Sequence, residues 1–246
     1  MGTWNEQQIA GHRCELFTPA SPSQSNFTLI YLHDLDQQGL QGRAPYEERF
    51  EKYGLRAIVP YAARSWWSDK LCSEFDPSYS AEKFLLNKIV PWIDSNWDSK
   101  PPRIGLLGVG MGGQGGLRLS FKYPDTFPLV AAITPFIDHQ WCWQDPHSLL
   151  DQMYQNQEAV RQDTATLHIH PLYWPRNIWF CADASGTDWL ESAQRLRMKL
   201  SALGIPHEVD LETAIDGTAT DYERHMVPPA IDFLAARLAQ EERRVQ

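Results

Sequence analysis

Short hydrophobic runs alternate with amphipathic segments along most of the chain. The runs are rich in β-branched and aromatic residues and are followed by turn-forming residues, which is typical of buried strands. They predict strands over residues 27–33, 55–59, 103–107, 127–133, 177–181 and 207–211. Apolar residues at helical spacing predict helices over 84–97, 114–123, 189–203 and 222–239. Because strands alternate with helices, we expect an α/β fold with a mostly parallel sheet and helices on both of its faces.

Two of the predicted helices carry boundary signals. Pro91 lies inside the segment 84–97 and lacks the N–H that a helix interior needs, so it predicts a kink or a restart of that helix. Gly204, with Pro206 beyond it, predicts the end of the helix over 189–203.

The chain has 246 residues and contains neither a repeat nor a clear linker, so we expect a single domain over 1–246. One long segment, from about Pro135 to Pro175, lies between two predicted strands and mixes Trp, His, Gln and Asp. Ligands of parallel α/β sheets bind at the carboxyl ends of the strands. We therefore expect this insertion to form a cap over a cleft there.

Charge and composition exclude several classes of partner. The formal net charge is −9, and there is no basic run, which argues against nucleic acid or an anionic membrane as partner. Neither a signal peptide nor a run long enough to span a membrane is expected. The cysteines are scattered, so we expect free thiols in a cytoplasmic protein; they are Cys14, Cys72, Cys142 and Cys181.

The glycine-rich stretch Gly108-Val109-Gly110-Met111-Gly112-Gly113 separates a predicted strand from a predicted helix. A strand, a glycine-crowded turn and a helix form the nucleophile elbow of α/β hydrolases, whose motif is G-x-S-x-G. Gly110 stands where that motif has its serine. The turn is therefore shaped for a nucleophile and carries none.

Three stretches of the chain resemble serine esterases of the α/β-hydrolase fold, and within them the esterase D-like branch. Met111-Gly112-Gly113 matches the end of an elbow that often has the form G-x-S-M-G-G. Tyr31-Leu32-His33-Asp34 matches the strand that leads to the oxyanion-hole loop, where the usual motif is L-H-G. The segment 201–208 contains a similar G-I-P-H turn, although glycine and proline after a helix are common in any fold.

The resemblance implies a triad of serine, acid and histidine in that chain order. Gly110 occupies the serine position, and Thr218 occupies the histidine position in Asp216–Tyr222. Asp183 or Asp188 is the candidate acid, with Thr187 as a further candidate for that position. A threonine is no general base near neutral pH, and loss of the serine alone removes most of the rate.

We therefore expect a non-catalytic esterase-like homologue that binds a small ligand or a protein, without a cofactor or a metal. The alternative is a weak or repurposed carboxylesterase. Gly110 also relieves the backbone strain of the elbow, so Gly110→Ser is expected to lower the melting temperature.

Dinucleotide binding is a less favoured alternative, because Gly108, Gly110 and Gly113 also satisfy G-x-G-x-x-G. That fingerprint usually follows the first strand and has an acidic residue about 20 residues later. Here it follows at least two other strands, and the next strand runs into Thr134-Pro135 instead.

Several polar and aromatic residues are candidates for lining the cleft. His33, Asp34 and Asp36 follow the first predicted core strand, and we expect His33 to pack and form hydrogen bonds beside the cleft. The Trp66-Trp67 pair follows another strand end, and Met111 follows the elbow. His168 and His170 have no third ligand at a fixed spacing, so we expect no metal site there.

Overall fold

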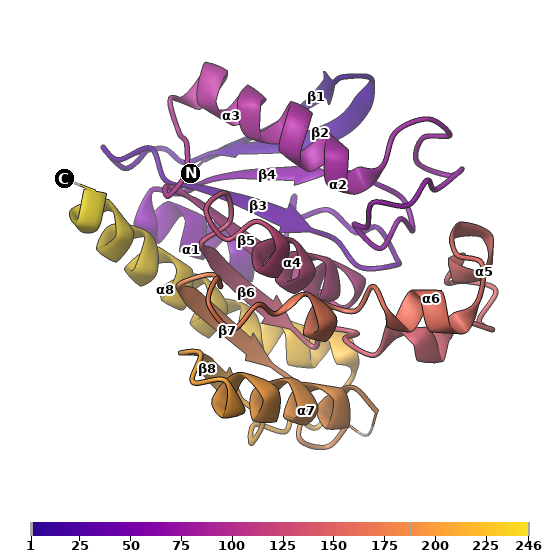
Figure 1. Ribbon diagram of the computed structural model, residues 1–246. Coiled ribbons are helices and arrows are strands. Elements are labelled where there is room, and N and C mark those ends of the chain that lie inside the picture. The colour runs from indigo at the N-terminus through magenta and orange to yellow at the C-terminus, as the bar shows by residue number, and fades with distance from the viewer. Residues whose placement is uncertain (1, 187, 246) are drawn as a thin grey trace.

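An eight-stranded, mostly parallel sheet forms the centre of the computed structural model, which describes residues 2–186 and 188–245 (Figure 1). The strand order is β1-β2-β4-β3-β5-β6-β7-β8. β1 and β2 form an antiparallel hairpin, β2 pairs antiparallel with β4, and all other pairs are parallel. The strands are β1 (Thr3–Ile9), β2 (His12–Thr18), β3 (Thr28–Leu32), β4 (Arg56–Pro60), β5 (Ile104–Val109), β6 (Leu129–Ile133), β7 (Asn177–Cys181) and β8 (Glu208–Asp210).

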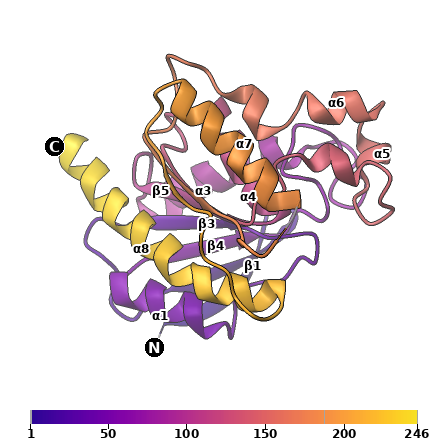
Figure 2. The same ribbon diagram turned by 90° about the horizontal axis from the view of Figure 1, so that it is seen from below.

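Helices cover both faces of this sheet. One face carries α1 (Ala44–Tyr53) and α8 (Ala219–Val245), which lie side by side in Figure 2. The opposite face carries α2 (Ala81–Phe84), η1 (Leu85–Ile89), α3 (Val90–Trp97), α4 (Met111–Lys122) and α7 (Asp188–Ala202). The remaining short helices are η2 (His139–Cys142), α5 (Leu150–Met153), α6 (Gln157–Arg161) and η3 (Ala165–His168).

The central strands are hydrophobic throughout because both of their faces are buried. In β3, Leu29 and Tyr31 contact the core beneath α1 and α8, whereas Ile30 and Leu32 contact the core beneath α4. Strands buried on both faces have continuous apolar runs rather than alternating ones. This is why the sequence pattern predicts these strands so clearly.

The predicted fold class is confirmed, and so is the break at Pro91. The helix over 81–97 passes through a π-helical turn, η1, before α3 begins at Val90. A π-turn next to proline accommodates the missing N–H without ending the helix. The helix predicted over 222–239 is longer in the structure, where α8 contains both Pro228 and Pro229.

The insertion between β6 and β7 packs along the flank of α4. η3 contacts α4, and the N–H of Ala165 donates to the side-chain oxygen of Gln114 at 3.3 Å. In Figure 1, α5 and α6 lie at the carboxyl end of the sheet, beside α4. The insertion thus packs against α4 through η3, and its first residues reach the carboxyl end of β5, where Phe136 lies beside Gly110.

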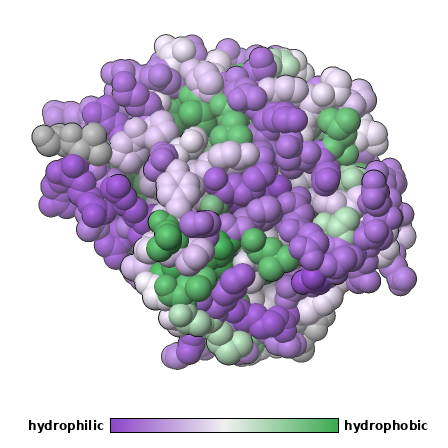
Figure 3. All heavy atoms as spheres, viewed as in Figure 1, coloured by the Kyte–Doolittle hydropathy of each residue, from purple (hydrophilic) through white to green (hydrophobic). Residues whose placement is uncertain are grey.

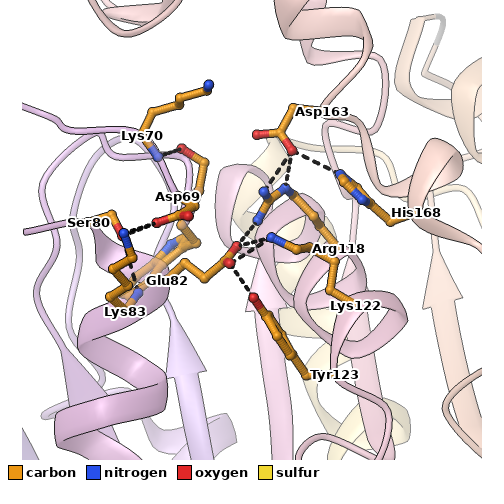
Figure 4. A network of polar contacts seen from close by, with 12 residues as sticks. Asp69, Lys70, Ser80, Glu82, Lys83, Arg118, Lys122, Tyr123, Asp163 and His168 are labelled. Carbon is orange, nitrogen blue, oxygen red and sulfur yellow. Dashed lines mark hydrogen bonds and ion pairs between the residues drawn. The ribbon is translucent and has the colours of Figure 1, made fainter.

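A buried ionic network fixes the insertion to α4 and α2 (Figure 4). Arg118 of α4 pairs with Glu82 of α2, and its Nε donates to Asp163 of the insertion at 2.7 Å. Lys122 donates to Glu82 at 2.6 Å, and His168 lies 2.9 Å from Asp163. The exposed fractions of Arg118 and Glu82 are only 3% and 2%, so each charge depends on its partners.

The surface is mainly hydrophilic on the face drawn in Figure 3, and its hydrophobic residues form separate patches. Met198 in α7 and Leu203, directly after α7, are among the exposed hydrophobic residues. No helix among the described residues is both long and apolar enough to cross a bilayer. All four cysteines are free thiols in the structure.

Candidate functional site

Strand β5 passes into α4 through one sharply bent residue, Gly110. Its φ of 53° and ψ of −114° are values that residues with side chains rarely adopt. The N–H of Gly110 donates to the carbonyl of Ile133 at 3.0 Å, and the N–H of Phe136 donates to the carbonyl of Gly110 at 3.1 Å. A Cβ on Gly112 would collide with the carbonyl of Leu32, so the helix start needs glycine to pack closely. The turn has the geometry of a nucleophile elbow.

The carboxylate of Asp34 occupies the space that a side chain at Gly110 would need. A Cβ built on Gly110 would collide with the carboxylate oxygens and Cγ of Asp34. Asp34 Oδ1 accepts hydrogen bonds from the N–H of Met111 at 2.8 Å and from the N–H of Leu35 at 2.8 Å. In an α/β hydrolase, the N–H of the residue after the nucleophile and an N–H from the loop after β3 form the oxyanion hole. The carboxylate of Asp34 therefore accepts the hydrogen bonds of both N–H groups that are expected to form the oxyanion hole.

Burial and the start of α4 act on this carboxylate in opposite directions. Burial raises the pKa of Asp34 to about 6, and the charges of Asp36 and Glu223 also raise it. The hydrogen bonds from Met111 and Leu35 lower the pKa, but burial outweighs them. No cation is among the hydrogen-bond or ion-pair partners of Asp34 in the part of the chain that the structure describes.

A cavity of about 160 Å³ opens beside Gly110 and Asp34, at the carboxyl ends of β3, β5 and β6. Val109 and Phe136 supply apolar walls, whereas Asp36, Glu223 and Arg43 supply charge. Arg43 Nη2 lies 2.8 Å from Glu223 Oε1, so these two charges compensate each other.

Glu223 also accepts a hydrogen bond from the hydroxyl of Tyr46, which lies on α1. This contact ties the start of α8 to α1 at the edge of the cavity. No motif in the sequence points to Arg43 or Glu223. Because they are 180 positions apart, no local spacing connects them.

His33 is fully buried beside the elbow, and both of its ring nitrogens form hydrogen bonds with backbone groups. Its Nδ1 lies 2.8 Å from the carbonyl oxygen of Asp34, and its Nε2 accepts from the N–H of Ala62 at 3.1 Å. These partners place the proton on Nδ1. Burial lowers the pKa of His33 to about 4, so the ring is neutral at neutral pH. The arrangement agrees with a packing role rather than that of a base for position 110.

The two tryptophans expected in the cleft lie in the core instead of lining the cavity. The indole N–H of Trp67 donates to the carbonyl of His33 at 3.2 Å, and its side chain packs against Gly115. The indole N–H of Trp66 donates to the carbonyl of Ser148 at 2.8 Å. Met111 is also fully buried and contributes its N–H, not its side chain, to the site.

Thr218 is exposed and caps the start of α8. Its Oγ1 donates to Asp221 Oδ2 at 2.8 Å, and the N–H of Asp221 donates to Thr218 Oγ1 at 3.2 Å. The N–H of Thr218 also donates to Asp221 Oδ2 at 3.0 Å. This reciprocal arrangement is a capping box, and it gives Thr218 a structural role in the place of the expected histidine.

The candidate acids make no triad contact that the structure describes. Asp183 Oδ1 accepts from the N–H and the hydroxyl of Ser185, at 2.9 and 2.7 Å. Asp188 begins α7, but its side chain lies outside the described part of the chain, and Thr187 lies outside the described residues altogether.

The cavity therefore offers acceptors and charge rather than a nucleophile. None of its described lining residues is a serine, cysteine or histidine. Within the described residues, no three His, Cys, Asp or Glu side chains come close enough together to hold a metal ion. Hydroxyls are supplied by Tyr31, Thr134 and Thr220.

Comparisons with known proteins agree with the fold and the turn. The family model described as putative esterase matches residues 17–221. Over 113 residues the chain is 27% identical to a protein of Mycobacterium avium named diacylglycerol acyltransferase/mycolyltransferase Ag85C. That alignment covers 44% of this chain and 32% of the relative, so the chain matches about a third of the relative's length.

Solved structures match nearly the whole chain. The fluorophosphonate-binding serine hydrolase FphF of Staphylococcus aureus has a TM-score of 0.75 at 15% identity, covering 95% of this chain and 98% of that one. An S-formylglutathione hydrolase from Agrobacterium tumefaciens has a TM-score of 0.73 at 14% identity, with coverage of 96% and 94%. Together with the family match, the topology and the elbow geometry, these likenesses identify the chain as a member of the esterase family with the α/β-hydrolase fold.

Proposed function

We propose that this protein is a non-catalytic homologue of the esterase D-like branch that binds a small ligand in the cavity beside Gly110. The observation that carries the proposal is the position of Asp34. Its carboxylate accepts from both expected oxyanion-hole donors and fills the space of a side chain at position 110. An ester that entered the cavity would meet a carboxylate where its carbonyl oxygen needs hydrogen-bond donors.

The degenerate triad positions support the same proposal. Gly110 has no group that could attack, and Thr218 is committed to the cap of α8. Residual catalysis by the binding site alone would reach about 10³–10⁴-fold over water, and only with a free oxyanion hole.

A weak or repurposed carboxylesterase is the second candidate, favoured by membership of the esterase family. Hydrolysis of p-nitrophenyl acetate distinguishes the two. We expect no turnover above that of a heat-denatured sample, and the same result for Asp34→Gly, which frees the donors but adds no nucleophile. Saturable turnover by the wild type that Asp34→Gly changes would refute the non-catalytic role.

A further inference from the structure

We propose that the cavity beside Gly110 binds a small protonated primary amine. This inference rests on the ligand-binding role proposed above and names the chemical class of its ligand. In active esterases of this fold, the oxyanion hole presents hydrogen-bond donors to the carbonyl oxygen of the ester. In this protein the same place presents an acceptor, the carboxylate of Asp34.

The two donors of the oxyanion hole are no longer available to a ligand. The N–H groups of Met111 and Leu35 both donate to Asp34 Oδ1. Oδ2 of Asp34 accepts no hydrogen bond from any residue that the structure describes, and Asp34 lines the cavity. A ligand that complements this group must donate hydrogen bonds, as an ammonium group does.

The charges around the cavity favour a cation. Among the described lining residues, the carboxylates of Asp34, Asp36 and Glu223 face the single guanidinium of Arg43. That guanidinium is held by Glu223 at 2.8 Å, so no described residue of the cavity wall compensates the charges of Asp34 and Asp36. A half-buried carboxylate without a cation is costly, and a bound ammonium ion would remove much of that cost.

The walls of the cavity favour an organic cation over a metal ion. Within the described part of the chain, no three potential ligands among His, Cys, Asp and Glu come together as a metal ion requires. Val109 and Phe136 add apolar surface, which suits the alkyl chain of an organic cation. The volume of about 160 Å³ is small beside the roughly 300–1,000 Å³ of pockets for drug-sized ligands, which suits a short alkyl chain.

Calorimetric titration with n-butylammonium chloride tests the inference, at low salt and about pH 7.5, where Asp34 is ionised. n-Butanol and sodium butyrate are probes of similar shape that are neutral and anionic. We expect heat of binding from the ammonium ion alone. Asp34→Asn, which keeps the shape and removes the charge, is expected to weaken binding by about tenfold or more. Glu158→Gln is the matched control, because it removes one carboxylate charge at an exposed site on α6 and is expected to change nothing.

Circular dichroism establishes that each variant is folded. If Asp34→Asn does not fold, Asp36→Asn takes its place, with a smaller loss of affinity expected. The inference is overturned if butylammonium does not bind at high millimolar concentration, if butanol or butyrate binds equally well, or if calcium chloride binds in its place. Each of these results leaves the ester assay untouched, so failure of the amine class is distinguishable from failure of the non-catalytic role.

Discussion

Two carboxylate sites lie along the same helix, α4, and they differ in how their charges are compensated. At the start of α4, Asp34 receives two backbone hydrogen bonds and, among the residues that the structure describes, no cation; burial raises its pKa to about 6. Further along α4, Arg118 joins Glu82 and Asp163. Burial acts to raise the pKa of Asp163 as well, but His168 and Arg118 hold that pKa well below its usual range.

The difference separates a structural site from the proposed binding site. The network around Arg118 is complete within the chain, so it holds the insertion against α4 and leaves nothing for a ligand to supply. The site around Asp34 is not compensated in this way. The N–H groups of Leu35 and Met111 donate to its carboxylate, but the negative charge faces a cavity. Helix starts favour anions, which explains how α4 accommodates a carboxylate that burial disfavours.

The largest effect is expected where the network is broken. Arg118→Met leaves the buried Glu82 and the half-buried Asp163 without their main cation, so the free energy of unfolding should fall by about 3–5 kcal/mol in urea titrations. Arg161→Met, which removes a guanidinium from an exposed pair, should change it by less than about 0.5 kcal/mol. Similar small effects of both changes would mean that the network does not hold the insertion.

Gly110→Ser tests whether the position of the Asp34 carboxylate depends on the missing side chain at residue 110. Backbone strain at a φ of 53° and the collision with Asp34 should together lower the free energy of unfolding by about 2–4 kcal/mol. Asp34→Gly in the same chain removes the collision, so a double-mutant cycle should give a coupling of about 1–3 kcal/mol. A rise in melting temperature for Gly110→Ser, or additive effects, would contradict the account of the elbow.

The raised pKa of Asp34 predicts a dependence of stability on pH. A carboxyl group whose pKa is higher in the folded protein contributes stability below its unfolded pKa, near 3.8, and loses it as the pH rises through about 6. Relative to Asp34→Asn, the wild type should therefore lose on the order of 2 kcal/mol between pH 4 and pH 7. If the unfolding free energies of the two proteins changed with pH in parallel, the pKa of Asp34 would not be raised in the folded protein.

Of these test substitutions, Thr218→Ala should change the free energy of unfolding least. Loss of the capping box typically costs about 1 kcal/mol of unfolding free energy, and Thr218→Ser should restore it. Thermal unfolding measures both. No loss in the alanine variant would remove the structural explanation for threonine at this position.

The sequence predicts the centre of the fold better than its edges. β7 has the bounds that the hydrophobic pattern predicts, 177–181, because both of its faces are buried. The hairpin of β1 and β2 was missed because β1 is an edge strand with mostly exposed, polar residues. α1 was missed because charged residues dominate it and only Tyr46 and Phe50 are buried.

The candidate site was predicted only where it is local. The elbow at Gly110 and the cleft position of Asp34 follow from short motifs. That Asp34 takes the hydrogen bond from Met111 depends on two segments 77 residues apart, which one sequence does not connect. In retrospect, one signal was present: Asp34 replaces the glycine of L-H-G in the same chain where Gly110 replaces the serine.

Labelling with a fluorophosphonate probe tests the central claim most directly, with FphF, which its name describes as fluorophosphonate-binding, as the positive control. We expect FphF to be labelled and this protein to remain unlabelled at equal concentration and time. Stoichiometric labelling of the folded protein, mapped by mass spectrometry to a residue beside Gly110, would show that a nucleophile works there after all.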